Sequence, residues 1–230
     1  KGIFRIGVAV GENPEGPFTP MDKPIEGSFS IDPAVYKDDN GEYYMYFGGI
    51  WGGQLQRWRE GVFNPSNPTS PTAFLPNDDE PALLPFVAKM SDDLLEFAEK
   101  PREVQILDEK GKLLLAGDNE RRFFEAAWVH KYNGKYYFSY STGDTHFICY
   151  AIGDNPYGPF TYKGKILNPV VGWTSHHSIC EFKGKWYLFY HDSSLSKGVT
   201  HLRSIKIAEI QYDKEGLIRT LDPYNDFSIL

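Results

Sequence analysis

Three stretches of the chain repeat one pattern of hydrophobic and polar positions. Each has a short segment of mixed polarity, a polar turn that contains glycine, and a second segment rich in aromatic residues; they cover residues 36–47, 129–140 and 179–190. Aromatic and β-branched runs on both sides of such a turn predict a β-hairpin. At 40–41 and 133–134 the turn is Asn-Gly, which predicts a two-residue type I′ turn with positive φ at both positions.

A second repeat alternates with the hairpins. Residues 9–19 and 151–161 share the pattern Gly-acidic-Asn-Pro-x-Gly-Pro-Phe-Thr, residues 88–93 hold a degenerate copy, and an apolar strand at 204–210 takes the same place in the last unit. Strands and hairpins in this order predict successive blades of a β-propeller, whose repeats are about 40–50 residues long. We therefore expect an all-β fold with three nearly complete blades and one leading strand.

Three segments fall outside this pattern. The segment 58–85 holds six prolines, which exclude it from a sheet interior and predict a surface loop. Residues 112–116 are apolar and fit either a short strand or a turn of helix. Residues 92–99 leave a helical alternative open.

Composition narrows the classes of function. The 230 residues carry 24 Lys and Arg against 31 Asp and Glu, and this net charge of −7 disfavours binding to nucleic acid phosphates. No run approaches the roughly 18 apolar residues of a membrane-spanning helix. Aromatic residues make up 16% of the chain, a content suited to strands and to a surface that binds sugar rings. Cys149 and Cys180 lie in apolar stretches, so we expect two buried free thiols, which slightly favour a cytoplasmic location.

Two carboxylates lie where the pattern calls for buried positions. Glu125 and Asp32 each come just before the hairpin of their unit. Strands that converge on a propeller axis bring both side chains to the same end of the channel. Paired carboxylates across one cleft are what glycoside hydrolysis requires, with one of them as the proton donor. The alternatives are an ion pair of Glu125 with Arg121 or Arg122, and a turn role for Asp32 before Pro33.

Three more residues are candidates for the same end of the channel. His176 occupies the matching position in the third unit, and Arg203 begins the last strand, where a guanidinium can hold sugar hydroxyls or the carboxylate of the acid. Trp51 lies in a glycine-rich loop, where we expect it to be exposed and able to stack on a sugar ring. The alternatives are a packed structural histidine, a solvated arginine and a tryptophan of the core.

These motifs resemble glycoside hydrolase family 43 over essentially the whole chain. Residues 30–33, Ser-Ile-Asp-Pro, are similar to the second-blade motif of that family, residues 124–128 to its third-blade motif, and the His-x-Ser pattern at 176–178 to the motif of its axial histidine. The resemblance implies a five-bladed β-propeller, with residues 1–230 as a single catalytic domain. Ala127 is a mild departure, because the family more often has proline there.

The resemblance also implies a role for each candidate. Glu125 is the general acid, and Asp32 orients it and modulates its pKa. His176 contacts a calcium-centred water cluster at the propeller axis, which is the implied metal site. Arg203 contacts the bound sugar, and Thr145 falls at another position expected to contact it.

One catalytic residue of the family, the general base, has no counterpart in this sequence. In the family the general base is an aspartate ahead of a strand that resembles residues 4–18, and this sequence begins at that strand. Family 43 enzymes invert, which requires a base and an acid about 6.5–9.5 Å apart. We therefore expect the sequence to be a fragment of a longer enzyme with its first blade largely missing, the rest being joined to it or supplied by a separate chain.

The expected function is exo-acting release of xylose from β-1,4-xylooligosaccharides in hemicellulose degradation, with terminal α-L-arabinofuranose as a second substrate. The alternatives are a non-catalytic carbohydrate-binding propeller and an exo- or endo-acting α-1,5-L-arabinanase. The expected partners are xylo- or arabino-oligosaccharides, with neither nucleic acid nor a membrane among them. The pattern leaves open the oligomeric state and whether calcium, sodium or water occupies the axis.

Overall fold

The computed structural model describes residues 2–59, 61–66, 70, 72–173 and 176–225 of the chain. The fold is all-β, as the pattern predicts. Its strands are β1 (Ala9–Val10), β2 (Thr19–Pro20), β3 (Ala34–Lys37), β4 (Tyr43–Phe47), β5 (Phe86–Lys89), β6 (Arg102–Glu103), β7 (Ile106–Leu107), β8 (Glu125–Tyr132), β9 (Lys135–Ser141), β10 (Ile148–Gly153), β11 (Phe160–Leu167), β12 (Ser178–Phe182), β13 (Lys185–Asp192) and β14 (Ser204–Ile210).

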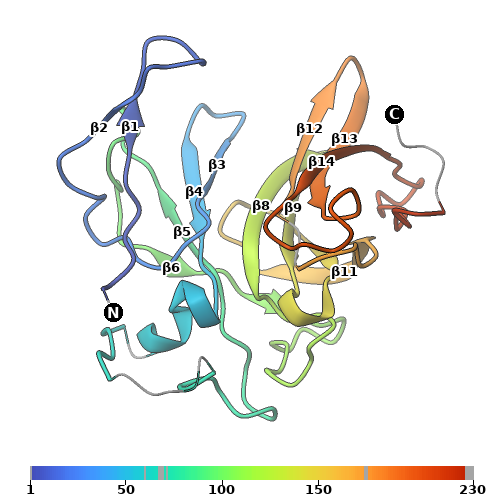
Figure 1. Ribbon diagram of the computed structural model, residues 1–230, viewed down its shortest axis with the longest axis horizontal. Coiled ribbons are helices and arrows are strands. Elements are labelled where there is room, and N and C mark those ends of the chain that lie inside the picture. Colours follow the sequence, from blue (N-terminus) through green and yellow to red (C-terminus); the bar gives the residue numbers. More distant parts are fainter. Residues whose placement is uncertain (1, 60, 67–69, 71, 174–175, 226–230) are drawn as a thin grey trace.

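These strands form a two-stranded ribbon and three larger sheets. The ribbon is β1-β2, and the sheets have the orders β3-β4-β5-β6, β7-β11-β10-β9-β8 and β12-β13-β14. The sheets follow one another across the molecule in chain order, from the blue ribbon to the orange and red strands (Figure 1). One ribbon followed by three sheets agrees with the predicted leading strand and three units.

The helical content of the described residues is limited to three short 3₁₀ turns. They are η1 (Trp51–Gly53), η2 (Leu55–Trp58) and η3 (Gly143–Thr145). Residues 92–99 contain turns and one isolated bridge, Met90 to Phe97, instead of a helix. Residues 112–116 contribute single bridges and no strand or helix. Within the described part of the chain, no helix has the length and apolar character needed to cross a membrane.

One of the two predicted Asn-Gly turns has the expected geometry. Asn133 and Gly134 have φ values of 47° and 74°, and they join the paired residues Tyr132 and Lys135 at the ends of β8 and β9. Positive φ at both central positions is the mark of the type I′ turn.

The other Asn-Gly turn was predicted wrongly. The backbone N–H of Asp38 bonds to the carbonyl of Glu42 at 2.8 Å, and of the three residues between them Gly41 alone has positive φ, 86°. A three-residue loop with a left-handed glycine therefore replaces the two-residue turn at Asn40. The carboxylate of Asp38 accepts a hydrogen bond from the Tyr136 hydroxyl at 2.6 Å, so a contact with the next sheet holds this loop.

One edge strand from each of the three sheets lies next to that of the neighbouring sheet. β8 packs against β3 on one side and β12 on the other, and we call these three the inner strands. One apolar core fills the space between the β3-β4-β5-β6 sheet and the sheet that contains β8, and a second lies between the latter and the β12-β13-β14 sheet. Residues at the start of each inner strand are therefore brought to a common region.

The two cysteines differ in burial, which corrects the expectation that both are buried. Cys149 lies on β10 in the middle of its sheet and is buried, whereas Cys180 is exposed; both are free thiols. Cys180 lies on the edge strand β12, where residues 180–182 all face solvent. An apolar sequence context therefore did not distinguish a central strand from an edge strand.

A buried histidine lies in the second core. Nε2 of His130 lies 2.7 Å from the Tyr212 hydroxyl, and its ring packs on those of Tyr137 and Trp186 at centroid distances of 5.0 and 5.1 Å. Nδ1 is buried and has no hydrogen-bond partner among the described residues. Burial lowers the pKa of His130 to about 3, because the low-dielectric core disfavours the imidazolium.

This burial predicts a loss of stability in mild acid. His130 takes up a proton near the ordinary histidine pKa in the unfolded chain but not in the folded chain. Lowering the pH from 7 to 5 should therefore reduce the free energy of unfolding by about 2 kcal/mol through this residue. His130→Gln should reduce the difference between urea unfolding at pH 7 and at pH 5 by that amount. The control, His201→Gln, changes an exposed histidine. An unaltered difference in the His130 variant would contradict the assignment.

Candidate active site

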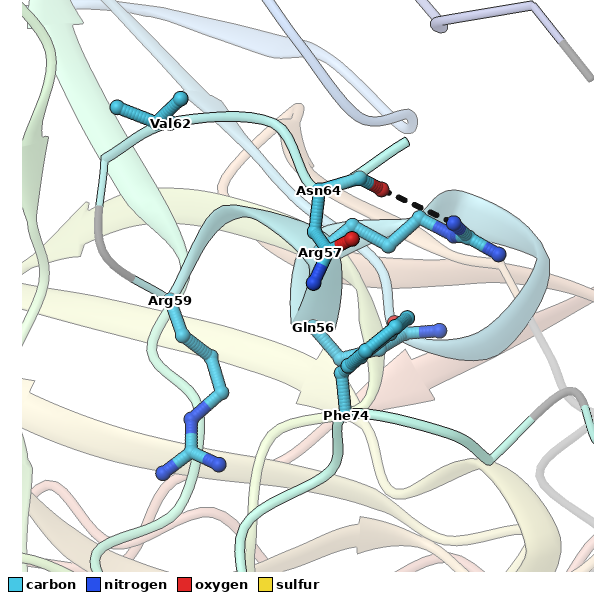
Figure 2. A pocket seen from close by; sticks show the side chains of 6 residues that line it. All are labelled: Gln56, Arg57, Arg59, Val62, Asn64 and Phe74. Atoms are coloured by element: carbon cyan, nitrogen blue, oxygen red, sulfur yellow. Dashed lines mark hydrogen bonds between the residues drawn. The ribbon is translucent and has the colours of Figure 1, made fainter. Parts of the chain in front are cut away.

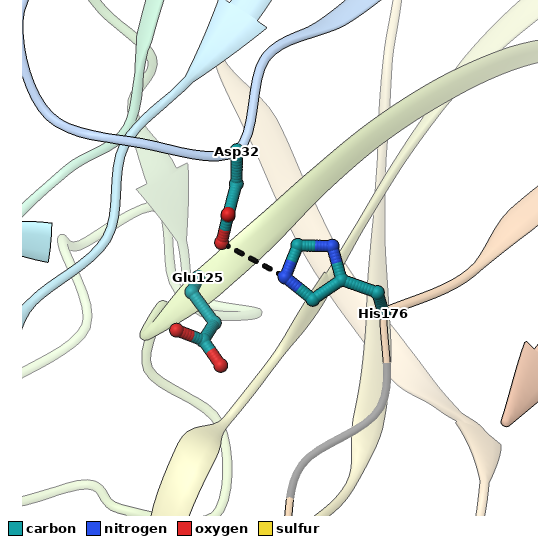
Figure 3. Close-up of side chains that lie close together, drawn as sticks. All are labelled: Asp32, Glu125 and His176. Atoms are coloured by element: carbon teal, nitrogen blue, oxygen red, sulfur yellow. Dashed lines mark ion pairs between the residues drawn. The ribbon is translucent and has the colours of Figure 1, made fainter. Parts of the chain in front are cut away.

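The segments that lead into the inner strands bring Asp32, Glu125 and His176 together (Figure 3). Asp32 comes two residues before β3, Glu125 is the first residue of β8, and His176 comes two residues before β12. One polar atom from each side chain lies within 4.8 Å of the others. Nε2 of His176 is 3.0 Å from Oδ2 of Asp32. The structure thus places three of the predicted site residues at one point.

The backbone at Asp32 is held by Ser30, a buried residue two positions before it. The Ser30 hydroxyl donates to the carbonyl of Gly53 at 2.8 Å and accepts from the N–H of Gly49 at 2.9 Å. The N–H of Gly48 adds a bond to the carbonyl of Ile31 at 2.8 Å. Asp32 itself has a φ of 60°, a left-handed conformation that costs a non-glycine residue about 1–3 kcal/mol. The loop 48–53 therefore fixes a strained aspartate against the inner strands.

A β-bulge sets the direction of Glu125. The pairing of β8 with β9 shifts between Glu125 and Trp128, so that one extra residue is accommodated on β8. Ala126 lies in this bulge with a φ of 62°, and its N–H donates to Oδ2 of Asp32 at 3.3 Å. Bulges next to active sites commonly re-aim a side chain. Here the bulge joins the backbone beside Glu125 to the carboxylate of Asp32.

The two arginines that were alternative partners for Glu125 have other partners. Arg121 forms an ion pair with Asp118 at 2.6 Å, and Nη2 of Arg122 lies 3.4 Å from Asp144. These pairs stabilise the segment before β8.

The pKa values of the neighbouring histidines 176 and 177 shift in opposite directions. Burial lowers the pKa of His176, but its hydrogen bond to Asp32 and the charges of Asp32 and Glu125 outweigh that effect, and the net shift is upward. His177 is enclosed, with Nε2 2.7 Å from the Ser139 hydroxyl, and burial lowers its pKa to about 3. The two carboxylates therefore favour the protonated form of His176, whereas burial favours the neutral form of His177.

His191 is a member of the site that the sequence did not single out. Its Nε2 accepts the backbone N–H of His176 at 3.2 Å and lies 3.4 Å from Nη1 of Arg203. Burial, together with the positive charges of Arg203 and His176, lowers the pKa of His191 to about 4, so it stays neutral and the lone pair of Nε2 can accept the His176 N–H. Its sequence signal was weak, because it is one of two polar residues at the end of the aromatic strand β13.

Arg203 reaches the site through His191. Its Nε also donates to the carbonyl of Thr200 at 3.0 Å, and the residue is exposed. Its sugar contact stays a prediction. Thr145, at the end of η3, has its hydroxyl 2.7 Å from both the Asn119 carbonyl and the Thr142 hydroxyl. These contacts tie η3 to the segment before β8, and a sugar contact of Thr145 also stays a prediction.

Trp51 is half-buried, which corrects its expected exposure on a flexible loop. Its ring meets Phe124 edge-on at a centroid distance of 5.1 Å and lies 5.9 Å from Trp173. The N–H of Ile50 bonds to the carbonyl of Phe124 at 3.0 Å. On the other side of Phe124, a Cβ added to Gly143 would lie 2.1 Å from its ring, so glycine is required there. The Trp51 loop and η3 thus enclose the residue before Glu125.

A separate hollow lies in the proline-rich segment. It has a volume of about 380 Å³ and is lined by Gln56, Arg57, Arg59, Val62, Asn64 and Phe74 (Figure 2). The Arg57 guanidinium donates to the carbonyl of Asn64 at 3.0 Å. None of the described residues that line this hollow carries a carboxylate.

The cluster of Asp32, Glu125 and His176 is the group among the described residues that could hold a metal ion. Calcium takes six to eight oxygen ligands. Two carboxylates and one imidazole supply too few, so the set fits calcium only with water as most of its ligands. Direct coordination by Glu125 would also prevent it from carrying the proton of a general acid.

The family assignment agrees with this geometry. The family described as glycosyl hydrolases family 43 matches residues 85–218, more than half of the chain. The chain belongs to glycoside hydrolase family 43. A relative from Bacteroides ovatus named xylosidase/arabinosidase is 64% identical over 220 residues, which cover 96% of this chain and 66% of the relative. A xylosidase/arabinosidase 43A from Humicola insolens is 62% identical, over 97% of this chain and 68% of its own length.

Solved structures of family 43 show the same fold. A β-xylosidase/α-arabinofuranosidase from a compost metagenome, in complex with xylotriose, matches with a TM-score of 0.93 and 65% identity over 97% of this chain and 67% of its own. An enzyme from Xanthomonas citri complexed with xylotriose matches with a TM-score of 0.92 and 56% identity, over 99% of this chain and 67% of its own. The chain therefore spans about two thirds of the length of these family 43 relatives.

Proposed function

We propose that the protein is an exo-acting, inverting glycoside hydrolase that releases xylose from β-1,4-xylooligosaccharides and also removes terminal α-L-arabinofuranose. The observation that carries this proposal is the approach of Asp32 and Glu125 at the start of the inner strands, in a family 43 chain. The names of the similar relatives, xylosidase/arabinosidase and β-xylosidase, support the choice of sugar.

In the proposed reaction Glu125 donates its proton to the glycosidic oxygen while the bond from this oxygen to the anomeric carbon breaks. A water molecule forms the new bond to that carbon from the opposite face, and its proton passes to a general base. For the base, the resemblance implies an aspartate ahead of residues 4–18. The negative charge of Asp32 favours the protonated form of Glu125, because two carboxylates this close do not readily ionise together.

For the architecture, we propose that the three sheets are blades of a five-bladed β-propeller, and that residues 1–230 belong to one catalytic domain. The packing of β3, β8 and β12 side by side supports this arrangement, because the first strand of each blade lines the propeller axis. The proposed active site then lies at one end of the axis.

For the metal, we propose that a calcium ion binds near His176 through water. It would supply a fixed positive charge beside Asp32. Treatment with EDTA should lower kcat/KM for xylobiose about tenfold and lower the midpoint of thermal unfolding, and added calcium should restore both. In His176→Ala, calcium should change neither quantity. A wild-type enzyme indifferent to EDTA and calcium in both measurements would contradict the site.

The function is tested by analysing the products that the full-length protein releases. Xylotriose should yield xylose one unit at a time, and nitrophenyl β-xyloside and nitrophenyl α-arabinofuranoside should both be hydrolysed. Cleavage of linear arabinan in their place would indicate an arabinanase. Binding of xylotriose without turnover would indicate a carbohydrate-binding propeller.

A further inference from the structure

His191 extends the pairing of β12 with β13 by means of its side chain. It is the last residue but one of β13, where that strand still pairs with β14 at Ile205. The β12-β13 ladder, in contrast, ends with the pair Ser178 and Phe189. Two residues further in the same register, His176 would face His191, and there the backbone N–H of His176 bonds to Nε2 of the His191 side chain at 3.2 Å. A side chain thus replaces the backbone acceptor just beyond the end of the ladder.

His176 depends on hydrogen bonds more than on packing for its position. Its side chain is 46% exposed, so packing alone restricts its rotation little. Its Nε2 meets Oδ2 of Asp32 at 3.0 Å, and its backbone N–H meets His191. These two contacts hold the residue at both ends. Without the His191 acceptor, the backbone N–H would turn to water and the ring would be free to leave Asp32.

Oδ2 of Asp32 connects this contact to Glu125. The same oxygen that meets His176 also accepts the N–H of Ala126 at 3.3 Å, and Ala126 directly follows Glu125. The Asp32 carboxylate is therefore held by one group ahead of β12 and one in the β8 bulge. Loosening either group changes how Asp32 faces Glu125. A misplacement of about 1 Å at a catalytic group can cost about a hundredfold in rate.

We propose that His191 is a positioning residue that acts through His176 on the Asp32 carboxylate. This inference rests on the proposed function, because the role of Asp32 is part of that proposal. The loss of His191 should therefore slow the step in which the leaving oxygen takes the proton of Glu125. It should have little effect on the affinity for the sugar.

Arg203 is the other group next to His191. Its Nη1 lies 3.4 Å from Nε2 of His191, whose one lone pair already accepts the N–H of His176. Arg203 also has a bond of its own, from Nε to the carbonyl of Thr200 at 3.0 Å. The effect of His191 therefore runs through His176 rather than through Arg203.

The first test removes the acceptor and keeps the volume of the side chain. In His191→Phe, kcat for xylobiose should fall about tenfold while KM changes less than about twofold. On a dinitrophenyl xyloside, whose leaving group needs no proton, kcat should fall less than about twofold. His191→Gln, whose side-chain carbonyl can accept the same N–H, should recover most of the loss. The matched control, His201→Phe, changes an exposed histidine and should keep the wild-type rates.

A double-mutant cycle tests the route of the effect. In a His176→Ala protein, adding His191→Phe should lower kcat for xylobiose further by less than about twofold. In an Arg203→Ala protein, the same addition should still cost about tenfold. Full additivity with His176→Ala, or loss of the effect in the Arg203→Ala protein, would overturn the proposal. Equal losses of His191→Phe on xylobiose and on the dinitrophenyl xyloside would overturn it as well.

A crystal structure of His191→Phe separates this proposal from the proposed function. If the wild type hydrolyses neither substrate, the proposed function fails, and the structure still decides on the positioning role. Nε2 of His176 should then lie more than about 3.5 Å from Oδ2 of Asp32, beyond hydrogen-bond distance. A contact that stays as short as in the wild type would show that His191 does not position His176.

Discussion

Glu125→Gln should lower kcat/KM for xylobiose by about 10³-fold, within the range that a positioned general acid contributes. The amide cannot donate a proton to the glycosidic oxygen, so the sugar alkoxide would have to leave unprotonated. On a dinitrophenyl xyloside, whose leaving group needs no proton, the loss should be less than about tenfold. Steady-state rates on both substrates measure the difference.

The matched control is Glu181→Gln, which makes the same change at an exposed residue of β12 and should keep the wild-type rates. A Glu125 variant that lost equal factors on the two substrates would not be a general acid. Such a result would instead point to a role in binding or in holding the bulge of β8.

Asp32→Asn should lower kcat/KM for xylobiose by about 10²-fold and move the alkaline limb of its pH profile to lower pH. The asparagine keeps the shape of the residue but removes the negative charge that favours the protonated form of Glu125. It also weakens the contacts with the Ala126 N–H and with His176. The measurement is kcat/KM between pH 4 and pH 9.

Asp22→Asn serves as the control, because Asp22 is exposed on the segment before β3. An Asp32 variant with an unmoved alkaline limb, or one moved to higher pH, would contradict the electrostatic role. A loss of rate alone would then reflect only the positioning of the backbone at Ala126.

The sequence predicted the meeting of Asp32, Glu125 and His176, because their equivalence is a property of its repeats. Each lies at or just before the first strand of its unit, and strands in equivalent positions of a repeating fold end in equivalent places. The same logic predicted the all-β fold and the order of the sheets. Local patterns were sufficient wherever one repeat could be compared with another.

Features that depend on contacts between units were not predictable in this way. The loop at Asn40 is longer than expected, and its first residue, Asp38, accepts a hydrogen bond from Tyr136, 98 residues away. Trp51 is half-buried because Phe124 and Trp173 come from other units. His191 joins the site through the backbone of His176 rather than through a motif. Such contacts leave no periodic signal in the sequence.

The stereochemistry of the first product tests the central claim most directly. Asp32 and Glu125 lie close enough to resemble the acid and nucleophile of a retaining enzyme, which are about 5–5.5 Å apart, whereas this account makes Asp32 an electrostatic partner and the reaction inverting. Proton NMR of xylotriose hydrolysis should therefore show α-xylose before mutarotation. Initial release of β-xylose would contradict the account and would make Asp32 a nucleophile.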